Sequence, residues 1–235
     1  MILGRALVTG ASNGIGRAVA VQLSEKGYDL VLVSRNQKGL AETAALCKTD
    51  AIIIATDLSS PDAIMQLIKR IQDLDRLDVI FYSHGVHQRV PFLEESVEAM
   101  QHDYQLYVSS ILQIDNALLP MIIKSKNSLS QAIIYMGSVS SVLSSANNGS
   151  YAMCKHALKA HAESLFEEVR ETGVKISTLF PGYINSREHT HAQLDPNKLI
   201  QVSDIVLAVE FCLSLSAAAC ATGIYLRPQY SPNVS

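Results

Sequence analysis

Short runs of consecutive apolar residues alternate along the chain with stretches in which apolar residues recur every three or four positions. The continuous runs predict strands covered on both faces, and the periodic stretches predict amphipathic helices. Strand, helix and strand repeat six times, which is typical of a parallel, doubly wound α/β sheet with helices on both faces. We expect strands at 5–9, 29–33, 51–55, 78–82, 131–136, 175–180 and 223–226, and helices at 16–27, 38–47, 61–74, 96–124, 150–172 and 203–214.

Local signals indicate where several of these elements begin and end. Ser60 and Ser203 are residues typical of helix N-termini. Gly27 and Gly173 are expected just after helix ends, because glycine adopts the left-handed conformation found there. The polar segment 183–202 predicts a loop near a site.

Composition limits the class of protein. Hydrophobic residues make up 48% and charged residues 17%, and no linker divides the chain, so one globular domain over 1–235 is expected. The 19 basic and 22 acidic residues give a net charge of −3, which argues against a nucleic-acid partner. Four widely spaced cysteines without a C-x-x-C pair indicate reduced thiols. No signal-peptide pattern and no bilayer-spanning apolar run are expected, with 206–221 the nearest, so the prediction is a cytoplasmic protein without a membrane partner.

A glycine-rich segment, TGASNGIG at 9–16, connects the first predicted strand to the first predicted helix. Glycines let the backbone approach a phosphate, and the free N–H groups at a helix start attract an anion. At this position in a doubly wound sheet, the segment predicts a dinucleotide site rather than a tight turn without a ligand. Its G-x-x-x-G-x-G spacing differs from the G-x-G-x-x-G of the common dinucleotide fingerprint.

Tyr151 and Lys155 stand four residues apart in the predicted helix 150–172. Residues at this spacing share one helix face, so the phenol and the ammonium are expected side by side. The pair fits either plain packing or a lysine that makes a tyrosine acidic, and other motifs must decide.

Five short motifs follow one another along the chain: the glycine segment at 9–16, Asp57-Leu58 after the third strand, Ser138 thirteen residues before Tyr151, the pair Tyr151 and Lys155, and Pro181-Gly182 followed by Ser186. In this order and spacing they resemble motifs of the short-chain dehydrogenase/reductase family, T-G-x-x-x-G-x-G, Asp-Val/Leu, the catalytic serine, Y-x-x-x-K and P-G-x-x-x-T. The resemblance covers nearly the whole chain. It implies a Rossmann-type, mostly parallel sheet of seven strands and an oxidoreductase that uses a nicotinamide cofactor.

The resemblance also implies roles for individual residues. Tyr151 is expected as general acid in carbonyl reduction and general base in alcohol oxidation, and Ser138 is expected to orient the substrate oxygen. A free tyrosine has a pKa of ~10, and the Lys155 ammonium is expected to lower that pKa and to bind the nicotinamide ribose. The expected cofactor contacts are Gly10, Ser12, Asn13, Gly14, Ile15, Gly16, Arg35, Asp57, Leu58, Gly85, Tyr151, Lys155, Pro181, Gly182, Ile184 and Ser186.

The end of the second strand indicates which nicotinamide is used. NAD sites place an acid there, whereas this chain has Ser34 and Arg35. A guanidinium can pair with the 2′-phosphate of NADP, and Asn13 and Arg17 add donors nearby. NADP(H) is therefore favoured over NAD(H), the alternative for Arg35 being a solvated loop charge. The predicted substrate is a ketone or secondary alcohol of a small molecule.

Two positions depart from the family pattern. Tyr107 stands where the family has an asparagine that feeds a water chain to the lysine, so we expect an altered proton relay, rerouted through Ser109 or Ser110. The sequence YSHG at 82–85 replaces N-N-A-G and brings in His84. A neutral, hydrogen-bonded histidine without a chemical role is the favoured interpretation of His84.

Other features leave partners and function open. His189 and His191 in the polar loop predict substrate contact or solvation, and no metal site, because two loop histidines without further ligands bind metal poorly. The resemblance implies a homodimer or homotetramer that packs 96–124 and 150–172 across a two-fold axis. Besides an NADP(H)-dependent oxidoreductase, a nucleotide-sensing or regulatory protein on the same fold remains a hypothesis, which Tyr107 favours.

Overall fold

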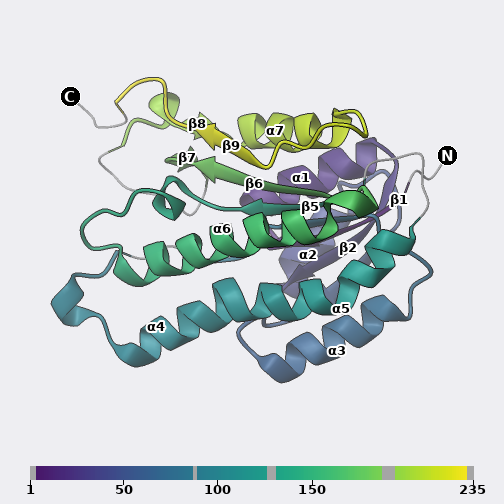
Figure 1. Ribbon diagram of the computed structural model, residues 1–235, viewed down its shortest axis with the longest axis horizontal. Coiled ribbons are helices and arrows are strands. Elements are labelled where there is room, and N and C mark those ends of the chain that lie inside the picture. The colour runs from purple at the N-terminus through teal and green to yellow at the C-terminus, as the bar shows by residue number, and fades with distance from the viewer. Residues whose placement is uncertain (1–3, 87–88, 126–130, 187–193, 232–235) are drawn as a thin grey trace.

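A computed structural model describes residues 4–86, 89–125, 131–186 and 194–231. One sheet of seven strands runs through it in the order β3-β2-β1-β4-β5-β6-β9, and every neighbouring pair is parallel (Figure 1). The predicted doubly wound, seven-stranded sheet is therefore confirmed, while its organisation as one domain over the whole chain stays a prediction. The strands are β1 Gly4–Thr9, β2 Tyr28–Ser34, β3 Ala51–Ala55, β4 Val79–Tyr82, β5 Ala132–Met136, β6 Lys175–Pro181 and β9 Gly223–Leu226.

Helices cover both faces of the sheet (Figure 1). Successive side chains of a strand point to opposite faces, so Leu7 of β1 packs with α3, α5 and α6, while Val8 packs with α1, α2 and α7. Both layers are fully buried at their centres, which explains why the strands read as continuous apolar runs. The helices are α1 Gly14–Glu25, α2 Gln37–Ala44, α3 Pro61–Gln72, α4 Val97–Tyr104, α5 Ser110–Lys124, α6 Gly149–Val169 and α7 Val202–Ser214.

The element ends agree with most of the local signals. Ser60 accepts a hydrogen bond from the N–H three residues later at the start of α3. Gly27 and Gly173 follow helix ends with φ of 90° and 84°, in the left-handed region expected of them. Ser203 does not cap α7, because the helix begins at Val202 and Gln201 is its capping residue.

The predicted helix 96–124 is divided by a single π-helical turn, Gln105–Ser109, between α4 and α5. Such turns insert one extra residue into an α-helix and are frequent at functional sites. The turn places Tyr107, the residue at the altered relay position, toward the interior, where it is 2% exposed.

The stretch Val97–Lys124 is long and apolar enough to cross a membrane by length and composition, contrary to our expectation that the chain has no such run. Its side chains Ile114 and Leu118 are fully buried against the sheet. One side of this stretch therefore packs against the sheet, while apolar side chains such as Leu112 are exposed.

A second, two-stranded ladder was not predicted. β7 (Ile184–Asn185) pairs in parallel with β8 (Ile200–Gln201). It joins the two ends of the segment 183–202 and brings the residues after β6 next to the start of α7. The ladder thus lies next to the carboxyl end of β6.

Candidate active site

The strand order reverses between β1 and β4, which is where doubly wound sheets bind ligands, beyond the carboxyl ends of the strands. A cavity of about 250 Å³ lies there. It is lined by Gly10, Ser12, Asn13, Gly14, Ile15, Gly16, Ser34, Arg35, Asn36, Thr56, Asp57, Leu58, Ser83, His84, Gly85, Val86, Leu106 and Ser186. Most of the expected cofactor residues thus surround one cavity, and their contacts with a cofactor stay a prediction.

The glycine segment forms a cradle that side chains would fill. Gly10 has φ of 66°, and a Cβ added to it would lie 2.7 Å from the Ser83 carbonyl oxygen. A Cβ on Gly16 would lie 2.3 Å from the Gly10 carbonyl oxygen. Among the described residues, no side chain caps the start of α1, since Asn13 makes no such hydrogen bond. The uncapped N–H groups and the bare backbone fit a phosphate.

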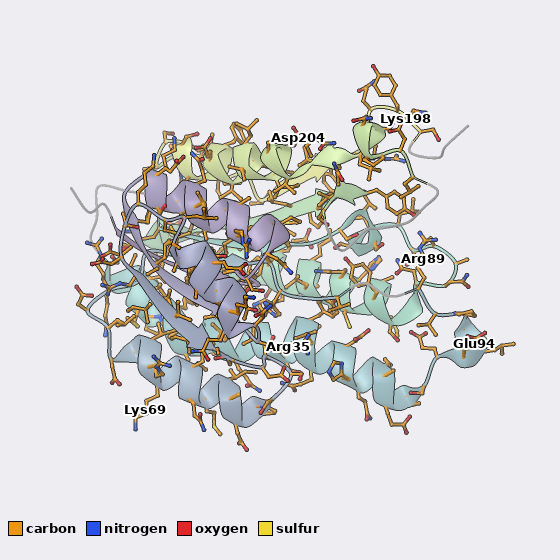
Figure 2. The ribbon with its side chains drawn as sticks, turned by 180° about the vertical axis from the view of Figure 1, so that it is seen from behind. Arg35, Lys69, Arg89, Glu94, Lys198 and Asp204 are labelled. Atoms are coloured by element: carbon orange, nitrogen blue, oxygen red, sulfur yellow. The ribbon has the colours of Figure 1, made fainter. Side chains whose placement is uncertain are left out.

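The end of β2 carries a positive charge and no carboxylate. Arg35 is exposed and lines the cavity from the connection between β2 and α2 (Figure 2). Arg17, expected to add a donor there, is instead bound between α1 and α2. Its guanidinium donates to the Thr43 hydroxyl at 2.9 Å and pairs with Glu42 at 3.0 Å. Arg35 is therefore the arginine among the cavity's lining residues.

Asp57 presents a carboxylate on the other side of this cavity. It accepts hydrogen bonds from the Ser59 N–H at 3.0 Å and the Ser59 hydroxyl at 2.8 Å. These bonds, together with the charge of Arg35, lower the pKa of Asp57. Its charged form is therefore favoured by the chain itself.

Three polar groups inside the site hold the His84 ring in place. Its ring contacts the Thr9 hydroxyl at 2.8 Å, the Leu106 carbonyl at 3.0 Å and the Ser110 hydroxyl at 3.2 Å. Burial lowers the pKa of His84 to about 4, so the ring is neutral near pH 7, as favoured from the sequence. The Ser110 hydroxyl donates a hydrogen bond of 2.6 Å to the Leu106 carbonyl. Its proton is therefore already engaged, although Ser110 was one of the two serines expected to carry the altered proton relay.

The structure brings Ser138, Tyr151 and Lys155 together. Ser138 follows β5 and begins the short 3-10 helix Val139–Ser141, and the other two lie in the first turns of α6. The side chains of Ser138 and Tyr151 share a hydrogen bond. The Lys155 Nζ lies 5.6 Å from the centroid of the Tyr151 ring and donates to the Met136 carbonyl at 2.6 Å.

The proton affinities of this group differ from the expectation. Burial, opposed by the hydrogen bond from Ser138, raises the pKa of Tyr151 to about 12. Burial lowers the pKa of Lys155 to about 8. Low-dielectric surroundings disfavour phenolate and ammonium alike, so the chain alone does not produce the lowered tyrosine pKa that we expected.

Tyr107 lies against Tyr151 and Lys155. Its ring lies 4.9 Å from the Lys155 Nζ and meets the Tyr151 ring edge-on, with the centroids 5.6 Å apart. Its hydroxyl donates to the Val86 carbonyl. A Cβ on Gly85 would lie 2.2 Å from the Tyr107 ring, so glycine is required there. The relay position therefore presents an aromatic face to the lysine.

A second cavity, of about 230 Å³, opens beside Ser138 and Tyr151. Gly182 lines it, whereas Pro181 and Ile184 are buried and line neither cavity. Sequence reasoning missed Arg89, whose only signal was a positive charge four residues after Gly85.

His189 and His191 lie outside the described residues. Within the described ranges, no group of three or more His, Cys, Asp or Glu side chains is placed to hold a metal ion. The predicted site therefore consists of the two cavities and the residues between them.

Known proteins resemble this chain over nearly its whole length. The short chain dehydrogenase family profile matches residues 5–197. An uncharacterised oxidoreductase of Staphylococcus epidermidis is 29% identical over 224 residues, which cover 95% of this chain and 96% of the relative. A Shigella flexneri structure complexed with NADP is 25% identical, with a TM-score of 0.82 and 98% of both chains covered. An Escherichia coli structure complexed with NADPH, 24% identical and covering 98% of both chains, shows the same fold with a TM-score of 0.84. With its fold, its glycine cradle and its convergent serine, tyrosine and lysine, the chain belongs to the short-chain dehydrogenase family.

Proposed function

We propose that this protein is an NADP(H)-dependent oxidoreductase that interconverts a ketone and a secondary alcohol of a small molecule. The observation that carries the proposal is the convergence of Ser138, Tyr151 and Lys155 at the same carboxyl edge of the sheet as the phosphate cradle. A protein that only bound a nucleotide would need the cradle but not a buried lysine beside the hydroxyls of Ser138 and Tyr151.

The cradle fits a dinucleotide, and its charge favours the phosphorylated one. The segment 10–16 would hold the pyrophosphate, and Arg35 would pair with the 2′-phosphate. Asp57 and Leu58 would lie beside the adenine, and Lys155 would bind the nicotinamide ribose. The NADP and NADPH in the Shigella flexneri and Escherichia coli structures support this assignment.

Residues of the chain itself would transfer the proton. When bound, the nicotinamide supplies the hydride and, in its oxidised form, a positive charge beside the catalytic pair. Ser138 holds the substrate oxygen, and the Tyr151 hydroxyl gives its proton to that oxygen during reduction and takes it back during oxidation. The Lys155 ammonium stabilises the phenolate. Because the pKa of Tyr151 is about 12 in the chain alone, this function needs the added positive charge.

The test is turnover of NADPH with a panel of small ketones, followed by the absorbance of the reduced cofactor. We expect Tyr151→Phe to lower kcat by about 10²- to 10⁴-fold, the usual contribution of a general acid, while NADPH binding is retained. Tyr230→Phe, at a tyrosine that is 67% exposed, is the matched control and should behave as wild type. Undiminished turnover by Tyr151→Phe contradicts the assignment.

A nucleotide-sensing protein is the second candidate. Tyr107 favours it, because its ring covers Lys155 at 4.9 Å where a water chain to the lysine would pass. The same panel separates the two functions. NADPH binding without oxidation of the cofactor by any ketone favours the sensor.

Arg35 provides the test of cofactor choice. We expect Arg35→Gln to weaken NADPH binding by about 10- to 100-fold, the range for loss of a hydrogen bond to a charged group. NADH lacks the 2′-phosphate, so its binding should change little and serves as the internal control. Equal losses for both cofactors contradict the assignment of Arg35.

We also infer a cytoplasmic homodimer or homotetramer. The four cysteines among the described residues are free thiols, which supports a reducing compartment. Apolar side chains are exposed on α4, α5 and α6: Tyr104 of α4 is 51% exposed, Leu112 of α5 44% and Met153 of α6 54%. Sedimentation of wild type and of Leu112→Glu tests this, because a charge at the interface should shift the population toward monomer.

A further inference from the structure

Arg89 gives the second cavity a positive charge. Its walls combine the catalytic residues with small hydroxyl side chains and two apolar residues, Val139 and Leu143. Among the described residues that line it, Arg89 is the one charged side chain. At about 230 Å³ the cavity is smaller than the roughly 300–1,000 Å³ typical of pockets for drug-sized ligands. It would therefore accept a small molecule.

Arg89 is held over this cavity from two separate segments. It lies between β4 and the 3-10 helix Phe92–Glu94, and its guanidinium donates to the hydroxyl of Tyr183, which follows β6. The guanidinium carbon also lies 5.9 Å from the centroid of the Tyr183 ring. Arg89 is an exposed residue, and these contacts with Tyr183 favour one position of its charge.

No carboxylate of the described chain neutralises this guanidinium. None of the ion pairs between described residues includes Arg89. Glu95 comes near in sequence, but its carboxylate accepts from the Ser150 N–H at 3.0 Å and does not line the cavity. A guanidinium has five N–H donors, so the bond to Tyr183 leaves donors for a ligand.

Arg89 also lies apart from the cofactor site. Figure 2 shows Arg89 and Arg35 in well-separated parts of the molecule, and Arg89 does not line the dinucleotide cavity. Its charge therefore belongs to the cavity that Ser138 and Tyr151 line and not to the dinucleotide cavity.

We propose that the substrate is a small oxo acid or the corresponding hydroxy acid, whose carboxylate pairs with Arg89 while its carbonyl faces Ser138 and Tyr151. This inference rests on the proposed oxidoreductase function. The planar guanidinium matches a carboxylate with two parallel hydrogen bonds, which orients the molecule as well as binding it. Arg89 is thus a specificity-determining residue.

The reaction leaves the carboxylate unchanged. In reduction, the carbonyl carbon receives a hydride, one hydrogen with two electrons, from the reduced nicotinamide, which becomes oxidised. The carbonyl oxygen receives the proton of Tyr151, and a proton from solvent restores the tyrosine. The sum is oxo acid plus NADPH plus a proton, giving hydroxy acid plus NADP⁺.

The experiment compares matched pairs of substrates, oxo acids of four to six carbons and their methyl esters. Wild type should show a kcat/KM about 10- to 100-fold higher for the acids, the range for a hydrogen bond to a charged group. Arg89→Gln should remove this preference, mainly through KM, because the pairing is the same in ground and transition states. Arg89→Lys should retain part of it. Arg70→Gln, at an exposed arginine of α3, removes the same charge elsewhere and should keep the full preference.

NADPH binding and the thermal midpoint of each variant show that it is folded. Equal kcat/KM for acids and esters in wild type, or full acid preference in Arg89→Gln, overturns the inference. If neutral ketones are then turned over and Tyr151→Phe abolishes that turnover, the oxidoreductase function stands while the oxo acid assignment falls. A wild-type preference for phosphorylated ketones over oxo acids overturns the carboxylate assignment. No turnover of any substrate by NADPH-bound protein overturns both proposals.

Discussion

Lys155 is held in the folded protein at a cost to stability. Its side chain is buried in α6, and the residue is 5% exposed. Burial lowers its pKa from 10.5 to about 8, so the folded chain binds this proton more weakly than the unfolded chain does. At about 1.4 kcal/mol for each pH unit, the charged form costs about 3 kcal/mol at pH 7.

Replacing Lys155 with methionine removes the charge and keeps an unbranched side chain of similar length. The substitution also removes the 2.6 Å hydrogen bond that the Met136 carbonyl accepts from Lys155, and this loss cancels about 1 kcal/mol of the stability gained. We therefore expect cofactor-free Lys155→Met to be about 2 kcal/mol more stable than wild type at pH 7, although its turnover is lost.

The pH dependence has a definite sign. Between pH 8 and 10.5 the folded wild type has released this proton while the unfolded chain still holds it, so wild-type stability rises with pH. The stability difference should change over this range by about 3 kcal/mol, so that above pH 10.5 Lys155→Met is about 1 kcal/mol less stable than wild type, the contribution of the lost hydrogen bond. Groups remote from Lys155 titrate equally in both proteins, so the difference reports on Lys155 and on Cys154, with which it interacts electrostatically.

Urea unfolding at pH 7 and pH 10 measures both effects. Lys69→Met, at an exposed lysine of α3 labelled in Figure 2, is the control and should differ little from wild type at either pH. A stability difference between wild type and Lys155→Met that is the same at both pH values would refute the reasoning, because burial would then not control this charge.

Three further perturbations test other parts of the structure. Asp115, 1% exposed, accepts hydrogen bonds from two buried tyrosine hydroxyls at 2.7 and 2.6 Å, so Asp115→Ala should lower the unfolding free energy by about 3 kcal/mol in urea titrations. Gly85→Ala should abolish NADPH binding, measured by fluorescence, because its Cβ would lie 2.2 Å from the Tyr107 ring. Gly173→Ala is the control: no atom lies within 4 Å of the added Cβ, so the substitution should cost only about 1 kcal/mol of backbone strain. Because the pKa of His84 falls from 6.5 to about 4 on folding, wild type should lose stability as the pH drops from 6.5 to 4. The thermal midpoint of His84→Gln should fall less than that of wild type over the same pH range.

The sequence by itself determined the order and type of the main elements. The strands 51–55 and 223–226 coincide with β3 and β9, and the other five strands were placed within one or two residues. Continuous apolar runs and 3.6-residue periodicity report burial that each segment carries locally, so no partner need be known to read them. The glycine segment was equally readable, because positive φ and close backbone approach exclude other residues.

Some site residues could also be predicted from the sequence, and others could not. Ser138, Tyr151 and Lys155 were identified from motifs that resemble those of the short-chain dehydrogenase/reductase family, and the structure brings them together. Arg17 was placed wrongly, because its contacts with Thr43 and Glu42 depend on how α2 packs beside α1.

Only the tertiary structure decided the rest. The pairing of β7 with β8, the π-helical turn that aims Tyr107 at Lys155, and the contact between Arg89 and Tyr183 join segments that are distant in sequence or depend on what packs around them. The direction of the Tyr151 pKa was also decided there, since burial, which raises this pKa, outweighed the hydrogen bond from Ser138, which lowers it. A local pattern shows which residues are present, but proton affinities and long-range contacts depend on distances and solvent exclusion that exist only once the chain has folded.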